Sequence, residues 1–189
     1  MLYIPTLLGS TRRGRQSPRV ATFVTAALAR NGRVVTLVLD LADYDLPMME
    51  ERLRMRDDPP PRLVEFAAEI ARADGLCVVS PEYNAGYPGV LKNALDYLLP
   101  ELKRKPVGIV TVSAGPNGGV SCLAQLRTVL LVMGALPVPA SLGVARVGEA
   151  LDDAGQPLDA SLEKRAASFL DELLFWTQAA ASQRRAPAT

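Results

Sequence analysis

Short runs of apolar residues alternate with segments of helical periodicity along almost the whole chain. The apolar runs predict strands at residues 3–8, 34–39, 76–79, 107–112 and, with the weakest pattern, 136–140. Apolar residues spaced three or four positions apart predict helices around residues 20–28, 63–70, 91–98, 123–131 and 162–173. Because the runs are continuously apolar rather than alternating, both faces of each strand should be buried. We therefore expect a doubly wound α/β fold, in which a parallel sheet lies between two layers of helices.

Prolines mark the expected irregularities of this fold. Pro5 lies inside the first predicted strand and removes a backbone donor, so pairing should begin at about that residue. Pro137 and Pro139 place the last strand at an edge of the sheet. The segment 42–62 is polar and rich in proline, which predicts a long loop of the kind often used as a lid or contact surface.

The two ends of the chain carry separate expectations. The tail SQRRAPAT, residues 182–189, is predicted to be disordered, which leaves residues 1–181 as one folded domain. The opening run MLYIPTLL is too short to span a membrane, and its arginines follow it rather than precede it, unlike a signal peptide. We therefore expect neither a membrane anchor nor export.

Charge and residue types exclude several classes of protein. Lys and Arg number 21 against 20 Asp and Glu, so no overall field recruits nucleic acid, and an anion site must be a local concentration of positive charge. The chain contains no histidine, which excludes Ser-His-Asp and Cys-His catalysis and zinc sites built on histidine. Carboxylate metal sites and cofactor chemistry stay open, although no metal site is predicted. Cys77 and Cys122 match neither a disulfide framework nor a metal-binding motif, which favours a reducing, cytoplasmic location.

The loop after the first predicted strand has the features of a phosphate site. It reads GSTRRGRQSPRVA over residues 9–21, with glycines that permit close backbone approach and several hydroxyls and arginines. Ser17 and Pro18 read as the N-cap and first residue of the next helix. The helix N-terminus should therefore point at this loop, where unpaired N–H groups and the helix dipole favour an anion.

Other readings of this loop are weaker or stay open. Gly9 to Gly14 has the spacing of a P-loop, but Arg15-Gln16 replaces the Lys-Ser/Thr pair, and no G-x-G-x-x-G follows the strand. Asp40, at the end of the second predicted strand, is more typical of a turn or cap than of a ribose-binding acid, so it is assigned no function. The loop could also be a solvated basic segment with an ordinary helix cap.

The ends of two further strands carry unusual residues. Residues 81–98 read PEYNAGYPGVLKNALDYL, in which rigid, flat and permissive residues precede a helix, and residues 113–119 read SAGPNGG, a possible backbone nest. A flat wall at 81–84, with Tyr83 and Tyr87 adding aromatic surface, suits a planar ring; a tight strand-to-helix corner is the alternative. For Lys92, Asn93 and Asp96, capping or subunit contact is favoured over catalysis.

Residues 9–21 and 81–98 together resemble the NADPH-dependent FMN reductase family of flavodoxin-like proteins, which includes quinone, azo-dye and chromate reductases. That family has a phosphate loop reading G-S-x-R before a Ser/Pro or Ser/Asn helix start, and a third strand ending in P-E-Y-N, then a proline-glycine turn and K-N-A-hydrophobic-D. This chain carries both motifs, with GSTRRGRQSP as a longer variant of the first.

The resemblance implies a flavodoxin-like three-layer α/β/α sandwich with a five-stranded parallel sheet in the order 2-1-3-4-5 and FMN at the carboxyl ends of the strands. The implied FMN-binding residues are, in the first loop, Gly9, Ser10, Arg12, Arg15, Ser17 and Pro18; in the second, Pro81, Glu82, Tyr83 and Asn84; and in the third, Ser113, Gly115, Gly118 and Gly119. The resemblance also implies a homodimer or homotetramer, with the third and fourth helices at the interface and the 42–62 loop near a neighbour's flavin.

The function implied by the resemblance is hydride transfer from NADPH, or NADH, to bound FMN, and then electron delivery to an acceptor such as a quinone, azo dye, free flavin or metal oxyanion. No catalytic side chain is required, because the flavin carries the redox chemistry. The alternatives are a flavodoxin-type electron carrier, which is usually strongly acidic, and a protein that senses flavin or nucleotide without turnover. The physiological acceptor, the choice between NADPH and NADH, and the role of Arg13 stay open.

Overall fold

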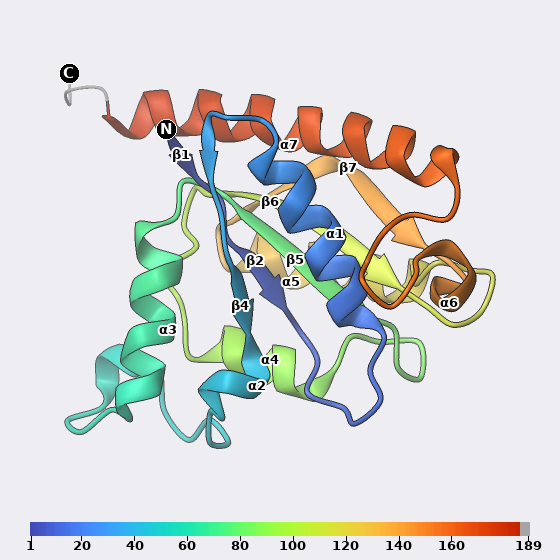
Figure 1. Ribbon diagram of the computed structural model, residues 1–189. Helices are drawn as coiled ribbons and strands as arrows, with labels where there is room; N and C mark the ends of the chain where they lie inside the picture. The colour runs from blue at the N-terminus through green and yellow to red at the C-terminus, as the bar shows by residue number, and fades with distance from the viewer. Residues whose placement is uncertain (186–189) are drawn as a thin grey trace.

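The computed structural model of the chain describes residues 1–185, and its centre is a five-stranded parallel sheet in the order β4-β2-β5-β6-β7 (Figure 1). The strands are β2 (Thr6–Leu8), β4 (Val38–Asp40), β5 (Leu76–Pro81), β6 (Pro106–Val112) and β7 (Leu136–Val144). Two short strands, β1 (Leu2–Tyr3) and β3 (Val34–Val35), pair with each other and precede β2 and β4 in the chain. Counting β1 with β2 and β3 with β4, the order is the predicted 2-1-3-4-5, which is confirmed.

Pro5 interrupts the first strand instead of starting it. Leu2 and Tyr3 pair with Val34 and Val35, so the prediction that pairing begins at about Pro5 is wrong. The Pro5 carbonyl accepts from the Cys77 N–H at 3.0 Å, so its missing donor also faces β5, which begins only at Leu76. Proline is tolerated because its missing donor faces the point where β5 is only beginning, so no bond inside the regular ladder is lost. The last strand, β7, lies at an edge as predicted.

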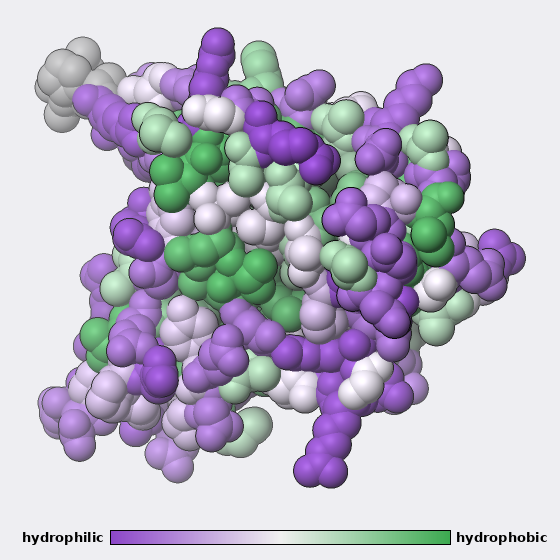
Figure 2. Space-filling model, viewed as in Figure 1, coloured by the Kyte–Doolittle hydropathy of each residue, from purple (hydrophilic) through white to green (hydrophobic). Residues whose placement is uncertain are grey.

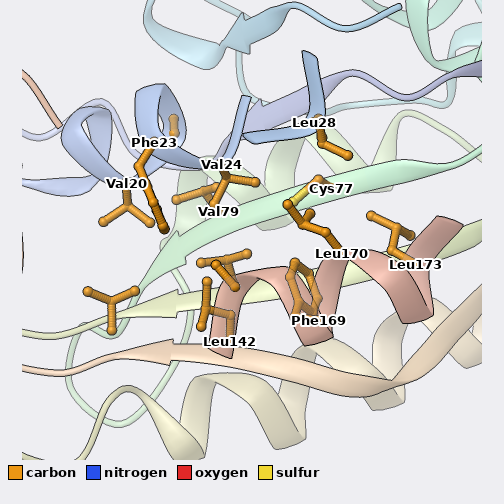
Figure 3. Close-up of a cluster of buried hydrophobic side chains, with 14 of the residues drawn as sticks. Val20, Phe23, Val24, Leu28, Cys77, Val79, Leu142, Phe169, Leu170 and Leu173 are labelled. Carbon is orange, nitrogen blue, oxygen red and sulfur yellow. The ribbon is translucent and has the colours of Figure 1, made fainter. Parts of the chain in front are cut away.

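Two layers of helices cover the sheet. One face carries α1 (Ser17–Ala29) and α7 (Ala160–Arg185), and the other carries α3 (Pro61–Arg72), α4 (Gly89–Asp96) and α5 (Val120–Val132). Every residue of β5 and β6 is buried, and successive side chains of β5 enter opposite cores: Cys77 and Val79 enter one, and Leu76 and Val78 the other. Figure 3 shows the first core, where α1 and α7 side chains meet those of β5 and β7.

The segment 42–62 is mostly irregular, as predicted, but it contains short helical turns. Helix α2 (Leu41–Tyr44) overlaps its start and the 3-10 helix η1 (Leu53–Met55) lies inside it. Asn93 of α4 anchors this segment through two hydrogen bonds. Its Nδ2 donates to the Pro47 carbonyl at 2.7 Å, and its Oδ1 accepts from the Met49 N–H at 2.8 Å. Asn93 is buried, so its role here is to anchor the loop rather than to cap a helix.

Helix α7 continues further than expected. It runs to Arg185, so the prediction of a disordered tail is wrong for residues 182–185; residues 186–189 lie outside the described residues. Arg184 donates to the carbonyls of Asp74 and Arg104 at 2.7 and 2.8 Å, and Arg185 pairs with the Asp74 carboxylate at 2.9 Å. These bonds hold the last turn of the helix to the start of β5.

The face of the molecule drawn in Figure 2 is mostly polar. In Figure 2, apolar surface lies over the edge formed by β3 and β4, where Val35, Leu37 and Val38 are partly exposed. A short helix, α6 (Val147–Ala150), follows β7. Within residues 1–185, no helix combines the length and apolar character that a membrane span requires.

Candidate functional site

Three loops meet at one edge of the sheet. Residues 9–16 follow β2, residues 82–88 follow β5 and residues 113–119 follow β6, and these three strands are neighbours in the sheet. Because parallel strands end at the same edge, the loops gather at the arrowhead ends of the strands in Figure 1. This is where ligands bind in open α/β sheets. The structure therefore brings together the three stretches that the sequence singled out.

The first loop begins with a glycine that packing requires. The Gly9 N–H donates to the Val79 carbonyl at 2.9 Å, and a Cβ on Gly9 would lie 2.8 Å from the Leu91 side chain of α4. A larger residue would require either the Leu91 side chain or the loop to shift. Gly14 has a φ of +69°, which favours glycine for a different reason, since a side chain there would strain the backbone.

Ser17 is a buried hydroxyl without a partner. The residue preceding α1 is Gln16 and the helix begins at Ser17, so the predictions of Ser17 as N-cap and Pro18 as first helical residue are both wrong by one position, although Pro18 still lies in the first turn. Ser17 is 1% exposed, and its Oγ has no hydrogen-bond partner among the described residues. A buried unpaired hydroxyl costs free energy unless a ligand pairs with it. Its position at a helix N-terminus suits an anion.

Arg15 is committed to an ion pair. Its guanidinium makes two parallel bonds to the Asp40 carboxylate, at 2.7 and 2.6 Å, and also donates to the Ser10 carbonyl. Asp40 in turn caps α2 by accepting from the Ala42 N–H at 2.9 Å. The structure thus gives Arg15 a role in tying the loop to the end of β4, and it gives Asp40, which was assigned no function, a part in shaping the loop.

Arg12 and Ser10 connect the first loop to the second. The hydroxyls of Ser10 and Tyr83 are 2.8 Å apart, and the Arg12 guanidinium lies 5.8 Å from the centre of the Tyr83 ring, within cation–π range. Arg12 and Arg13 are exposed, and neither forms an ion pair within residues 1–185. Two positive charges therefore remain beside a helix N-terminus.

The second loop is a two-residue hairpin turn. Tyr83 and Gly86 exchange backbone bonds of 2.8 and 3.0 Å, while Asn84 and Ala85 have φ angles of 51° and 61°. Both residues are exposed, and neither N–H has a partner within the described part of the chain. Two backbone donors are thus available at the ring side of the predicted site.

Glu82 and Tyr87 are placed differently from the other residues of this stretch. The Glu82 carboxylate accepts from the Cys122 N–H at 2.9 Å, in the first turn of α5, so it is directed at that helix. Tyr87 packs against the core under α4, and burial raises its pKa. The aromatic surface expected from Tyr87 is therefore largely inside the protein.

The third loop is held by its own hydroxyls. Ser113 Oγ donates to the Gly115 carbonyl at 2.8 Å and accepts from the Gly118 N–H at 3.0 Å, while Thr111 donates to the Gly118 carbonyl. Gly119 has a φ of +80°, and a Cβ there would lie 2.8 Å from that of Thr111. Gly115 faces open space instead. Gly118 and Gly119 thus shape the loop, and Gly115 leaves room beside it.

Neither cysteine is a nucleophile in this structure. Burial raises the pKa of the Cys77 thiol to about 12 and that of Cys122 to about 11. Cys122 lies behind the second loop, where its Sγ contacts Ser80 Oγ at 3.3 Å. Both thiols are protonated at neutral pH, so the site offers hydrogen-bond donors and positive charge but no activated sulfur.

The surface hollows of the described residues include two that lie away from the loops. One is lined by residues of α1 and α7, including Phe23, Leu170 and Leu174, and the other adjoins it near Met1 and Phe175. Neither contains a residue from the three loops. We place the candidate site at the loops because, within residues 1–185, a basic segment, a helix N-terminus and unpaired donors converge there.

The fold is flavodoxin-like, and its loops place a basic helix N-terminus opposite the 83–86 turn. The donors fit the phosphate of FMN: the unpaired Ser17 hydroxyl, the helix N-terminus and the charges of Arg12 and Arg13 surround one loop. The chain belongs to the NADPH-dependent FMN reductase family, whose sequence model matches residues 3–149. The predicted family is therefore confirmed.

Individual relatives agree with this assignment. The quinone reductase of Escherichia coli K12 is 37% identical over 139 residues, which cover 71% of this chain and 72% of the relative. An NAD(P)H-dependent FMN reductase of Schizosaccharomyces pombe is 36% identical over 130 residues, covering 67% of this chain and 64% of the relative. This chain is thus an FMN-dependent oxidoreductase with NAD(P)H as co-substrate.

Solved structures show the same fold. The flavoenzyme FerB, an NAD(P)H:(acceptor) oxidoreductase from Paracoccus denitrificans, superposes with a TM-score of 0.78 at 26% identity, covering 94% of this chain and 98% of FerB. A flavodoxin from Pseudomonas aeruginosa superposes with a TM-score of 0.57 at 17% identity, covering 94% of this chain and 99% of the flavodoxin. The second likeness shows the fold alone, and it confirms the flavodoxin-like prediction.

Sequence reasoning missed residues that act across the fold. Asp40 fixes Arg15, Asn93 anchors the 42–62 loop, and Gln125 of α5 contacts the 83–86 turn. Asp40 and Gln125 lie outside the two motifs at 9–21 and 81–98, whereas Asn93 lies within the second, where capping or subunit contact was expected of it. Their contacts join residues 25 to 46 positions apart in the chain, so only the folded structure could reveal them.

Proposed function

We propose that the three loops hold FMN, with its phosphate at residues 9–19 and its ring against residues 81–86, and that the protein passes electrons from NAD(P)H to a small-molecule acceptor of the quinone class. The observation that carries this proposal is the contact between Ser10 and Tyr83, which joins a loop suited to phosphate to a turn suited to a flat ring. An unpaired buried hydroxyl at Ser17 supports the phosphate end.

At the phosphate end, the expected donors are Arg12, the hydroxyls of Ser10 and Ser17, and the N–H groups at the start of α1. Charge-assisted bonds of this kind are the strongest that the loop can offer to a phosphate. Gly9 and Pro18 would act through the backbone, since a side chain at Gly9 would contact Leu91 and proline restricts the first turn of the helix. Arg15 would act by holding the loop in place through Asp40.

At the ring end, Tyr83 and Asn84 would form the wall, with the free N–H groups of the turn meeting polar atoms of the ring, while Pro81, buried at the end of β5, would support them from behind. The second side of the ring site would be the 113–119 loop, through Ser113, Gly115, Gly118 and Gly119. Glu82 would act indirectly, by holding α5 against the turn. When bound, FMN supplies the redox chemistry, because it can accept a hydride from a nicotinamide and pass electrons on to an acceptor.

The acceptor class rests on the relatives, several of which are named quinone reductases. Azo dyes, free flavin and metal oxyanions are the other acceptors that fit a protein without catalytic side chains. A flavodoxin-type carrier is less well supported, since such carriers are usually strongly acidic and this chain has a net charge of +1. A flavin sensor would bind FMN without consuming NADPH.

We also propose a cytoplasmic homodimer or homotetramer. Helix α5 is apolar on both sides: it buries Cys122, Leu126 and Leu130 and leaves Val120, Leu131 and Val132 exposed. A helix that is apolar all round is usually covered, so the α4–α5 side is the expected interface, with the 42–62 loop beside it. Two reduced cysteines support a reducing compartment. Light scattering after gel filtration would give the oligomeric state.

The deciding experiment is an absorption spectrum of the protein reconstituted with FMN, taken before and after anaerobic addition of NADPH. We expect a bound-flavin spectrum that bleaches with NADPH and recovers when a quinone is added. A protein that takes up no FMN would refute the site. A protein that binds FMN but does not oxidise NADPH would be the sensor or carrier instead. Comparing NADPH with NADH at equal concentration would give the nucleotide preference.

A further inference from the structure

The 83–86 turn has a backbone conformation that needs outside support. Asn84 and Ala85 both lie in the left-handed region, with φ angles of 51° and 61°. Asparagine tolerates this region, but for alanine the crowding of Cβ against the backbone makes it unfavourable. Left-handed residues other than glycine persist where their surroundings hold them, and they gather at binding sites. Ala85 therefore needs a neighbouring group that holds it in this conformation.

The side chain of Gln125, in α5, holds Ala85 in its left-handed conformation. Its Nε2 donates to the Ala85 carbonyl at 2.8 Å, while the N–H of the same peptide unit, which belongs to Gly86, donates to the Tyr83 carbonyl at 3.0 Å. The Ala85–Gly86 peptide is therefore fixed at both ends. The Gln125 side chain also packs against Gly86, since a Cβ there would lie 3.1 Å from Gln125 Oε1.

Gln125 is itself well placed to act as a support. Its helix is tied to the same segment by a second contact, because Glu82 accepts from the Cys122 N–H one turn earlier at 2.9 Å. The segment 82–86 is thus bonded to the first turns of α5 through both of its ends. A rigid helix, rather than a loop, determines where the turn lies.

We propose that Gln125 is a positioning residue for the ring end of the FMN site. It holds Ala85 in its strained conformation, so that the free N–H groups of Asn84 and Ala85 keep a fixed orientation toward the ring. This inference rests on the proposed function, and it concerns a residue outside both motifs of the family. Because Gln125 acts on the wall and not on the phosphate loop, its loss affects FMN and riboflavin alike.

The test replaces Gln125 with methionine, which keeps the length and helix propensity of the side chain but removes the donor. The loss of one neutral hydrogen bond should weaken flavin binding about two- to twelvefold. We expect the same factor for FMN and for riboflavin, measured by fluorescence quenching, and a change in the visible circular dichroism of the bound flavin. The matched control is Gln178→Met, at an exposed site on α7, which should change neither.

A second variant tests whether the effect passes through the turn. Glycine adopts the left-handed region without strain, so Ala85→Gly should recover most of the affinity lost in Gln125→Met. Unchanged affinity in Gln125→Met, a loss confined to FMN, or no recovery with Ala85→Gly would each overturn the inference while leaving the proposed function standing. A wild-type protein that binds neither flavin would overturn both.

Discussion

Replacing Ser17 with alanine should change stability and FMN binding in opposite directions. In the free protein, the Ser17 hydroxyl is buried and has no partner among residues 1–185. An unsatisfied buried polar group costs about 1–3 kcal/mol. Alanine removes that cost and leaves only a small void, so we expect the free energy of unfolding of the flavin-free protein to rise by about 1 kcal/mol. For a chain of this size, such a gain raises Tm by about 2–4 °C.

With FMN present, the sign should invert. If Ser17 donates to the phosphate, its loss removes a charge-assisted bond of about 1.5–3 kcal/mol, which weakens FMN binding roughly 12- to 150-fold. At a concentration 100 times the wild-type Kd, FMN stabilises the wild type by about 2.7 kcal/mol and the variant by only about 0.3–1.3 kcal/mol. The variant should then be less stable than the wild type by about 0.4–1.4 kcal/mol.

The assay is thermal or urea unfolding of both proteins with and without FMN, together with a fluorescence titration of FMN. Thr25→Ala serves as the control in the same helix, because the Thr25 hydroxyl donates to Thr6 Oγ1 at 2.9 Å and so is already paired. That variant should lose stability and keep its FMN affinity. A Ser17→Ala protein that is destabilised without FMN, or that binds FMN as tightly as the wild type, would show that the hydroxyl does not serve the phosphate.

Four further outcomes can be measured directly. Arg12→Ala should weaken FMN binding by roughly ten- to 150-fold and leave riboflavin unchanged; an equal loss for both flavins would make the arginine structural. Turnover should be ping-pong, with parallel double-reciprocal lines, because one ring face serves nucleotide and acceptor in turn; intersecting lines would contradict this. Burial, reinforced by Arg184, lowers the pKa of Lys105 to about 8. Between pH 8 and about 10.5 the unfolded state therefore binds more protons than the folded state, so the stability of the wild type should rise with pH relative to that of Lys105→Met. A difference in urea unfolding that does not change with pH would refute this expectation. Cys77 and Cys122 should react with a thiol reagent at pH 8 only after unfolding, since burial raises both pKa values; rapid labelling of the folded protein would contradict the structure.

Local sequence was enough to predict the architecture. Continuous apolar runs indicated strands buried on both faces, and the structure places β5 and β6 between two helical layers. Hydrophobic burial acts on whole strands and helix faces, so its pattern survives in the linear sequence. The two motifs at residues 9–21 and 81–98 also identified the family, because the residues that shape a phosphate loop and a tight turn are close together in the chain.

The boundaries of the helices and the pairing of the strands were harder to predict from the sequence. The pairing on both sides of Pro5 and the extension of α7 to Arg185 depended on neighbours distant in sequence. The last turn of α7, for example, is held by Asp74, more than a hundred positions earlier. Local propensity contains no information about such partners.

The difference between what the sequence determines and what the tertiary structure determines is clearest within the candidate site. The sequence by itself determined which chemical groups reach the edge of the sheet: arginines, hydroxyls, glycines and a rigid turn at the ends of three strands. Only the tertiary structure decided what each one does, pairing Arg15 with Asp40, turning Glu82 toward α5, leaving the Ser17 hydroxyl unpaired and bracing Ala85 with Gln125. The physical reason is that a hydrogen bond or close ion pair forms only with a group within about 3–4 Å, and in this fold those neighbours come from other loops and helices.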